Sequence, residues 1–331
     1  TVNPSTGGSS DTSYQVSGDC CILADLVKKT GGLIVDEVSM LDLSQFYYVL
    51  NELPEQNFRL ILVGDPDQLP SIGPGKVLKD MIEGNYLPVY RLETNYRQKK
   101  ALEMGQRVDI DASKMPKILE NAKKIIGGVT ELEPGIDFKI GRTHSDEQTL
   151  EIATQLLERI GAKDFMDDLI ILSPYSNKQF LATRNINKSF KSYFNPNPEV
   201  SWGPFSVNDR VMQMTNDYAK GIVNGDIGVI RQIKLSGNNN KQLDSLLVEF
   251  PSGNEEVKQI KYSAHTAREQ LTLAYAVSIH KSQGNGYKHV LVLIPQYYNS
   301  QFFNRNMLYT AVTRAKECVY LLGGNYDRAI E

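Results

Sequence analysis

The stretch Leu33-Ile34-Val35-Asp36-Glu37-Val38-Ser39-Met40 joins a short apolar run to two adjacent carboxylates. The apolar run predicts a buried strand, and open α/β sheets gather their ligands at the carboxyl ends of such strands. Asp36 and Glu37 stand at that end. Nucleotide-hydrolysing enzymes need two carboxylates there, because one can hold Mg²⁺ through its water shell while the other polarises the attacking water.

A second stretch further along the chain has a similar arrangement. Leu60-Ile61-Leu62-Val63 predicts the next buried strand, and Gly64-Asp65-Pro66-Asp67-Gln68-Leu69-Pro70 follows it as a loop rich in Gly, Asp and Pro. Gln68 has the right chemistry to sense a phosphate or its attacking water. An Asp-Glu pair alone is more often a solvated strand end, whereas the two stretches in this order favour a nucleotide site.

These stretches begin a series of segments that resembles the RecD-like branch of superfamily 1 DNA helicases. Five segments are similar to motifs II, III, IV, V and VI of that family, in the family's order: Val35 to Met40, Gly64 to Gly75, Asn95 to Gln98, Tyr275 to Gly284 and Leu308 to Lys316. They extend from residue 35 to residue 316 and so cover nearly the whole chain. Motif V departs from the family at Gly286, where an acidic residue often stands.

Length and composition are those of an ordinary globular protein with room for two or three domains. The 331 residues are 41% apolar and 23% charged. No run approaches the ~20 apolar residues that span a membrane, so no membrane partner is expected. The three cysteines, Cys20, Cys21 and Cys318, have neither zinc-site nor disulfide spacing, which predicts a reducing, cytoplasmic location and no structural metal.

The overall charge gives no sign of the basic stripe that nucleic-acid-binding proteins often carry, since the net charge is -3 and the pI is near 5.9. This weighs modestly against a nucleic-acid enzyme, because a motor on single strands can confine its positive charge to a channel. Local basic clusters lie at Arg184, Lys188 and Lys191 and at Lys258 and Lys261. A solvated face is the commoner meaning of such clusters.

The apolar runs predict an α/β protein with two parallel-sheet domains. Strands alternate with helical patterns from Leu33 to Arg97, and the alternation resumes with a helix through Ala122 and Ile126 and a buried strand at Leu169-Ile170-Ile171-Leu172. The resemblance implies that both are RecA-like motor domains, the first of them incomplete. We place them at residues 1–98 and at residues 116–201 with 269–331, joined by a linker at 99–115.

Short strands broken by turns fill the interval 202–268 and predict a small antiparallel barrel inserted into the second domain. The expected strands are Arg210 to Met214, Gly228 to Ile233, Ser245 to Phe250 and Val257 to Tyr262. Asn224-Gly225-Asp226 supplies turn residues between two of them. RecD-like helicases carry an SH3-like module at this place, so the resemblance implies an SH3-like β-barrel. Strands of the resumed sheet are expected at Val290 to Ile294 and Val319 to Leu322.

The resemblance implies ATP and Mg²⁺ as cofactors, together with the residues that serve them. Asp36 would hold Mg²⁺ through water, Glu37 would act on the attacking water, and Gln68 would couple the nucleotide state to DNA. Arg97 and Arg314 would stabilise charge on the transferred phosphoryl group. Gly284 would allow the close backbone approach that a phosphate or ribose needs. All six residues are implied to bind nucleotide, and all except Gly284 are implied to be catalytic.

Contacts with DNA are implied for residues of the second motor domain and the barrel: Ser173, Tyr175, Asn216, Tyr218, Ser278, His280 and Ser282. The segment Ser173 to Asn177 resembles the family's strand-gripping segment, although an ordinary strand-end turn accounts for it equally well. Tyr218 fits either a base-stacking residue or a barrel-core residue. His280 has no second His or Cys at ligand spacing, so packing near the DNA backbone is favoured over a metal site.

The sequence lacks one element that a RecD-like motor needs. A phosphate loop of the form GxxxxGK[ST] should precede motif II, and the nearest composition, Ser5-Thr6-Gly7-Gly8-Ser9-Ser10, has no lysine and no preceding strand. We therefore expect the chain to be a fragment of a longer motor that hydrolyses ATP poorly by itself.

The function implied by the resemblance is that of an ATP-dependent DNA helicase motor moving 5′ to 3′ along single-stranded DNA. Its partners would be the DNA strand and other subunits of a recombination or conjugation complex. Two alternatives stay open at this point. One is a non-catalytic nucleic-acid-binding module with helicase architecture, and the other is a viral-type RNA helicase that shares the motifs in looser form.

Overall fold

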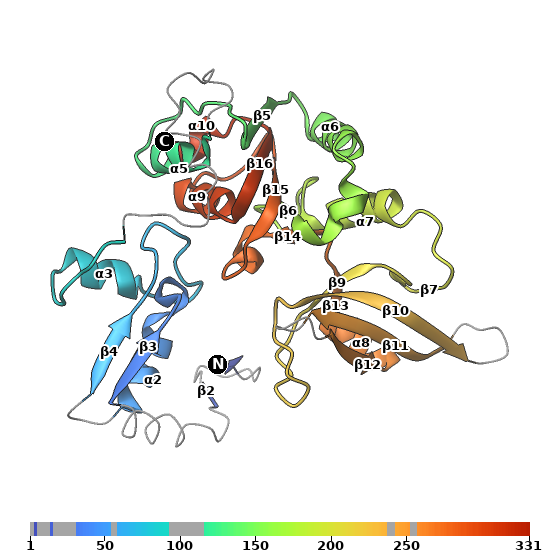
Figure 1. The fold of residues 1–331 in the computed structure, drawn as a ribbon, viewed down its shortest axis with the longest axis horizontal. Coiled ribbons are helices and arrows are strands. Elements are labelled where there is room, and N and C mark those ends of the chain that lie inside the picture. The colour runs from blue at the N-terminus through green and yellow to red at the C-terminus, as the bar shows by residue number, and fades with distance from the viewer. Residues whose placement is uncertain are drawn as a thin grey trace. The chain divides into compact units, whose positions relative to one another are not determined.

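A computed structural model describes residues 3–4, 14–15, 31–53, 58–92, 116–236, 242–251 and 257–331. The chain divides into two compact units, Thr1–Thr94 and Asn95–Glu331, and Figure 1 labels their elements. Arg97, the rest of the motif IV segment and the expected linker at 99–115 lie outside the described residues. The described helices include no candidate for a membrane span.

The first unit is centred on two parallel strands, β3 (Gly32–Val35) and β4 (Arg59–Leu62). Its helical elements are η1 (Val38–Met40), α2 (Leu43–Asn51) and α3 (Val77–Glu83). A further short antiparallel pair consists of β1 (Asn3–Pro4) and β2 (Tyr14–Gln15). The two predicted strands therefore exist, and each ends at the carboxyl edge where the polar motif residues begin.

The strands of the first unit are less buried than the sequence predicts. Ile34 and Ile61 lie opposite each other in the pair, and their side chains are 67% and 50% exposed. Residues opposite each other in a strand pair point to the same face, so this face of the two-stranded sheet receives little cover. The expectation of fully buried strands is wrong for that face, whereas the expectation of two strands is confirmed.

The second unit contains a parallel sheet with the strand order β14-β6-β15-β16-β5. Its strands are β5 (Phe138–Arg142), β6 (Leu169–Ser173), β14 (Ala276–Ser278), β15 (Tyr287–Ile294) and β16 (Ala315–Gly323). Figure 1 shows helices on both faces, with α6 (Asp146–Arg159) and α7 (Thr183–Phe194) on one and α5 (Ile118–Ile126), α9 (Arg305–Thr313) and α10 (Asp327–Ile330) on the other. Two 3-10 segments, η4 (Ala162–Asp168) and η5 (Ile279–Ser282), precede β6 and follow β14.

Apolar runs explain the centre of this sheet. Every residue of β6 is buried, as expected of a strand covered on both faces. Its side chains Leu169 and Ile171 share one core cluster with Leu291 of β15 and with Leu157 and Phe190 of the helices. The predicted strand at Leu169 to Leu172 and the predicted helix through Ala122 and Ile126 are both confirmed by the elements observed.

The inserted region forms an antiparallel sheet with the strand order β12-β11-β10-β9-β13. Its strands are β9 (Arg210–Gln213), β10 (Ile227–Ser236), β11 (Gln242–Pro251), β12 (Val257–Tyr262) and β13 (Leu271–Leu273). A hairpin of β7 (Ser201–Trp202) and β8 (Phe205–Ser206) and a helix, α8 (Ala264–Gln270), accompany them. One apolar core, containing Trp202, Ile230 and Val248, holds this module together. Because β13 belongs to the sheet, the barrel sheet continues past residue 268, and the domain boundaries stay predictions.

A buried carboxylate ties the barrel to helix α7. The side chain of Asp209 is fully buried and accepts hydrogen bonds from the Asn195 side chain at 2.8 Å and the Ser206 N–H at 2.7 Å. It also accepts a hydrogen bond from the Tyr275 hydroxyl at 2.9 Å and forms an ion pair with Lys191 at 2.7 Å. A carboxylate removed from water needs such partners, and here they come from both modules.

Two further connections join the barrel sheet to the parallel sheet. Arg210 at the start of β9 donates through Nη1 to the Leu169 carbonyl at 2.7 Å. The Asn187 side chain of α7 donates to the Leu273 and Ala276 carbonyls at 3.0 and 2.9 Å. β13 ends at Leu273 and β14 begins at Ala276, so two residues carry the chain from one sheet to the other.

Candidate nucleic-acid interface and nucleotide site

The carboxylate pair lies where the sequence predicts, at the carboxyl end of β3. Asp36 is exposed, and its Oδ1 accepts the Glu37 N–H at 2.8 Å. Glu37 has a φ of 53°, a left-handed conformation that residues with a Cβ rarely adopt. The Val38 N–H then donates to the Val63 carbonyl at 3.0 Å. This bond fastens the turn after Glu37 to the end of the neighbouring strand, so the Asp-Glu pair is held in a defined place.

The loop after β4 brings Gln68 into the same unit. The Gln68 Nε2 donates to the Asp65 Oδ2 at 3.3 Å, whereas its Oε1 is buried and has no hydrogen-bond partner in the described part of the chain. A Cβ on Gly64 would lie 3.2 Å from the Val38 nitrogen, so the loop approaches the backbone after β3 closely. Burial and the nearby carboxylate of Asp65 raise the pKa of Asp67. The two predicted stretches are thus neighbours in space.

Asp36 and Glu37 fit a Mg²⁺-nucleotide by their chemistry. Both are oxygen donors, the ligand type that Mg²⁺ prefers, and Mg²⁺ is usually bound through one or two carboxylates with water and phosphate oxygens completing its shell. No cluster of three or more His, Cys, Asp and Glu side chains suited to a metal occurs among the described residues. A site of two carboxylates completed by water and phosphates is consistent with that finding.

Arg314 ends helix α9 and is almost wholly buried, with 1% of its surface exposed. Its Nε donates to the Thr310 carbonyl at 3.1 Å and its Nη1 donates to the Asn285 carbonyl at 3.2 Å. Gly284, just before Asn285, has a φ of 77°, and a Cβ built on it would meet nothing within 4 Å. The motif VI arginine therefore contacts the segment that follows motif V.

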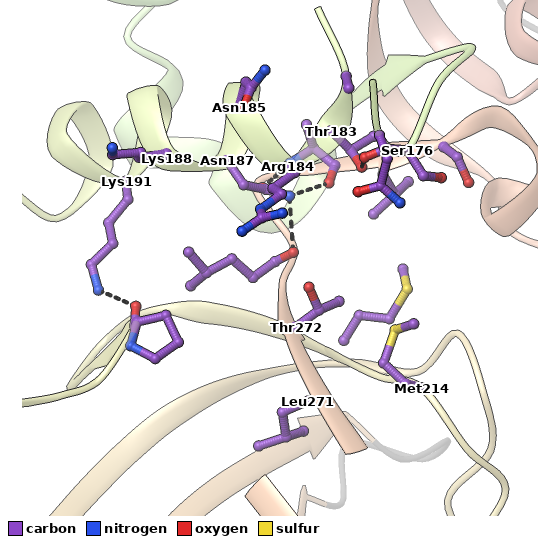
Figure 2. Close-up of a pocket in the computed structure, with 18 of the residues that line it drawn as sticks. Ser176, Thr183, Arg184, Asn185, Asn187, Lys188, Lys191, Met214, Leu271 and Thr272 are labelled. Atoms are coloured by element: carbon purple, nitrogen blue, oxygen red, sulfur yellow. Dashed lines mark hydrogen bonds between the residues drawn. The ribbon is translucent and has the colours of Figure 1, made fainter. Parts of the chain in front are cut away.

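A groove of about 1310 Å³ lies in the second unit, between helix α7 with the loop before it and the barrel. Figure 2 shows Arg184, Lys188 and Lys191 of α7 on one side and Thr272 and Met214 of the barrel on the other. The three basic residues of α7 are spaced by four and three positions and therefore share a helix face. That face lines the groove.

The groove is cationic. The basic side chains that line it are Lys178, Arg184, Lys188, Lys191, Arg268 and Lys281, and no Asp or Glu lines it among the described residues. Lys191 is paired with Asp209, whereas the other five form no ion pair with a carboxylate in the part of the chain that the structure describes. Unpaired cations around a concave surface create the positive field that an anionic polymer requires.

The predicted motif V residues divide between the groove and the core. Ser278 lines the groove, and so does Lys281, whose pKa is lowered by burial and whose Nζ donates to the Met214 sulfur at 2.9 Å. His280 packs its ring against Phe302, and burial lowers its pKa. Ser282 is fully buried and donates to the Ile279 carbonyl at 2.7 Å. The predicted direct contact between Ser282 and DNA therefore does not fit the structure.

The residues of the segment after β6 are likewise divided between the core and the groove. Ser173 is fully buried and its hydroxyl donates to the Leu181 carbonyl, so it holds the loop and is not open to a direct DNA contact as predicted. Tyr175 stacks on Phe302 with ring centroids 5.0 Å apart. The next residues, Ser176 to Lys178, line the groove. The strand-gripping segment thus reaches the groove through residues that the sequence does not single out.

Asn216 and Tyr218 lie in the barrel loop after β9 and outside the residues that line the groove. The Asn216 side chain donates to the Tyr218 hydroxyl at 3.0 Å and accepts the Asn224 N–H at 2.8 Å. Tyr218 is 51% exposed, which excludes the alternative of a barrel-core residue. Its contact with DNA stays a prediction.

The sequence misses several residues of the groove. Lys178, Arg268 and Lys281 stand in three separate segments and belong to no basic cluster. Only the spacing of Arg184, Lys188 and Lys191 carries a local signal, because it marks one face of a helix. The apolar wall formed by Met214 and the β13 strand has no signature in the sequence.

Three family models match separate segments of the chain. A model of the AAA domain matches residues 3–126, one of the ATP-dependent RecD-like DNA helicase SH3 domain matches residues 186–250, and one of the UvrD-like helicase C-terminal domain matches residues 273–322. Together they cover the stretches around Asp36 and Gln68, the barrel from β7 into β11, and motifs V and VI.

Curated relatives and solved structures are similar over most of this chain. An uncharacterized protein of Methanocaldococcus jannaschii is 29% identical over 89% of the chain and 29% of its own length. The RecD subunit of the RecBCD enzyme of Mycolicibacterium smegmatis is 28% identical over 89% of the chain and 50% of its own length. A Pif1 helicase from Bacteroides, solved with ADP-AlF3 and ssDNA, is 16% identical, with a TM-score of 0.46 over 98% of this chain and 77% of that one.

The chain thus spans half or less of the length of these curated relatives. The matches nevertheless follow a definite order, because the match to the RecD-like SH3 domain lies between the matches to the AAA domain and to the UvrD-like helicase C-terminal domain. In the kind and order of these matches, the chain is similar to RecD-like DNA helicases.

Proposed function

We propose that this chain is the greater part of an ATP-dependent DNA helicase motor that moves 5′ to 3′ along single-stranded DNA. The observation that carries the proposal is the cationic groove, which contains Ser278 and Lys281 of motif V. Among the described residues its lining includes no carboxylate, and five of its six basic side chains form no ion pair with one. The similarity of the chain to RecD, a subunit of the RecBCD enzyme, favours action together with other subunits of a recombination complex.

In this proposal the polar residues after β3 and β4 serve the nucleotide. Asp36 holds Mg²⁺ through water, Glu37 orients the attacking water, and Gln68 passes the state of the nucleotide to the DNA site. When bound, Mg²⁺ neutralises charge on the phosphates. Arg97 and Arg314 meet the charge of the transferred phosphoryl group. Gln68 suits its role because its Oε1 has no hydrogen-bond partner among the described residues.

The groove holds the strand mainly through its phosphates. The cationic face of α7 attracts the backbone of the strand, and the apolar side chains of the barrel wall, Met214 and Leu271 among them, offer a surface to sugars and bases. Such binding is independent of sequence, as a motor that passes along DNA requires. The barrel belongs to this site because its strands form one of the walls.

Salt-dependent binding of a labelled single strand tests the groove. Replacing both Arg184 and Lys188 by Ala should weaken binding and reduce the slope of log affinity against log salt by about 1.4, since each phosphate contact on a single strand contributes about 0.7. The matched control is the double replacement of Lys234 and Lys261 by Ala, because these side chains are exposed and lie outside the groove.

The outcomes separate the competing functions. Equal slopes for the two double variants would remove the groove from the DNA site. Strand binding by the complete protein without strand-stimulated ATP hydrolysis would support the non-catalytic module. Stronger stimulation by RNA than by DNA of the same sequence would support the RNA helicase.

A further inference from the structure

Three aromatic rings gather where strands of the parallel sheet end. Tyr175 follows β6, His280 lies in η5 directly after β14, and Phe302 lies in the connection from β15 to α9. The rings of Tyr175 and Phe302 are stacked, with centroids 5.0 Å apart and planes 23° apart. The ring of His280 lies 6.0 Å from that of Phe302 at 34°. The cluster thus joins three separate loops at the carboxyl edge of the sheet.

The connection that carries Phe302 is built as a rigid turn. The Asn299 carbonyl accepts the N–H groups of Phe302 at 3.0 Å and Phe303 at 2.9 Å, and the Asn299 N–H donates to the Tyr175 hydroxyl at 3.2 Å. Phe303 is fully buried and packs edge-on against Tyr298. Phe302, its neighbour in the chain, nevertheless keeps 42% of its surface exposed. A large apolar ring is thus held at the surface by residues anchored in the core.

Chain neighbours of this ring cluster line the cationic groove. Ser176, which follows Tyr175, lines that groove, as do Ser278 and Lys281 near His280. Aromatic faces next to a track of cations are how proteins hold single strands without reading their sequence, because every base has a π-face. Burial lowers the pKa of His280, so its ring is neutral at neutral pH and supports stacking without adding charge.

We propose that Phe302 stacks on one base of the single DNA strand at this end of the groove, with the rings of Tyr175 and His280 supporting it. The inference rests on the proposed function, because it requires a strand in the groove. The cations would hold the phosphates, and a base beyond the last of those contacts would meet the exposed face of Phe302. The contact adds affinity for any base and selects none.

A variant series combined with a modified strand tests this stacking. Phe302→Ala should weaken binding of a mixed-sequence single-stranded oligonucleotide by roughly 5- to 150-fold, the range measured for removing one base–aromatic stack. Phe302→Tyr should bind as the parent chain does, and Phe302→Leu should lose nearly as much as Phe302→Ala, because leucine fills space without a π-face. On an oligonucleotide of the same length without bases, all four proteins should bind equally.

Tyr297→Ala is the matched control in the same connection. Tyr297 is 87% exposed and has no ring partner among the described residues, so its loss should change affinity little. Equal losses for Phe302→Ala on the normal and base-free strands, or equal losses for Tyr297→Ala and Phe302→Ala, would overturn the stacking contact. Failure of the parent chain to bind any single strand would overturn the proposed function as well. Unfolding midpoints close to that of the parent chain show that each variant is folded.

Discussion

Arg314 carries a charge although only 1% of its surface is exposed. Its guanidinium donates hydrogen bonds to two backbone carbonyls. If it meets transition-state charge, replacing it by Ala in the ATP-hydrolysing protein should lower the turnover number by about a thousandfold or more. Nucleotide affinity should fall much less. Arg314→Lys is the matched variant, since lysine keeps the charge and loses the planar fork. Equal losses in affinity and turnover would mark uniform binding and contradict the role.

His280 gives the folded chain a dependence on pH. Burial lowers its pKa from the ordinary value of 6.5, so the unfolded chain takes up the proton first as the pH falls. Above about pH 6.5 His280 is neutral in both states and does not lower the free energy of unfolding. This free energy should decline as the pH falls from 6.5 toward the lowered pKa. Urea unfolding at about pH 7.5 and 5.5 measures the decline, and His280→Asn should make it smaller. An unchanged decline in that variant would assign the effect to other groups.

The side-chain roles that depend on accessibility could not be predicted from the sequence. Ser173 and Ser282 stand in motifs that touch DNA in the resembling family, yet the structure uses both hydroxyls to bond carbonyls within their own loops. The identity of a serine does not indicate whether its side chain faces solvent or the core. By contrast, Asp36 lies at the strand end that its neighbours predict, because a strand and its carboxyl end are local features.

At the scale of elements, the Asp209 network decides whether the barrel is attached firmly. Asp209→Ala removes the buried partner of Lys191 and should lower the free energy of unfolding by roughly 3–5 kcal/mol, the cost of breaking a buried ion pair. Tyr275→Phe removes one hydroxyl bond to the same carboxylate and should cost only about 1 kcal/mol. Chemical unfolding of both variants measures the difference. Similar small losses would show that the network contributes little to attachment.

Elements were predicted well where their signal is local. The strand Val257 to Tyr262 has the predicted bounds, and the strand at Leu169 to Leu172 gains one residue, because apolar runs and turn residues lie side by side in the chain. The groove could not be predicted in this way. Its walls come from α7 and from segments near Arg268 and Lys281, which are far apart in sequence and meet only through the packing of barrel on sheet. The exposed face of the β3–β4 pair was missed because the burial of a sheet face depends on which other elements pack against it, and this is not a local feature of the strands.

At the scale of the whole chain, the sequence contains the groups that we propose to act late in hydrolysis and has no GxxxxGK[ST] stretch. We expect this polypeptide alone to show little ATP hydrolysis, with or without single-stranded DNA, because the β-phosphate would lack its cradle of backbone amides. Steady-state hydrolysis assays test this, with strand binding as the control for a folded second unit. Strong turnover stimulated by the strand would mean that another segment cradles the phosphates.

The link of two residues between β13 and β14 has a mechanical consequence. A tether this short has almost no slack, and Arg210 and Asn187 brace it on either side. Tension on the motif V segment is therefore transmitted to the barrel without being absorbed by a loop. We therefore expect the barrel and the parallel sheet to move as one rigid body, because the two residues between them leave no room for a hinge.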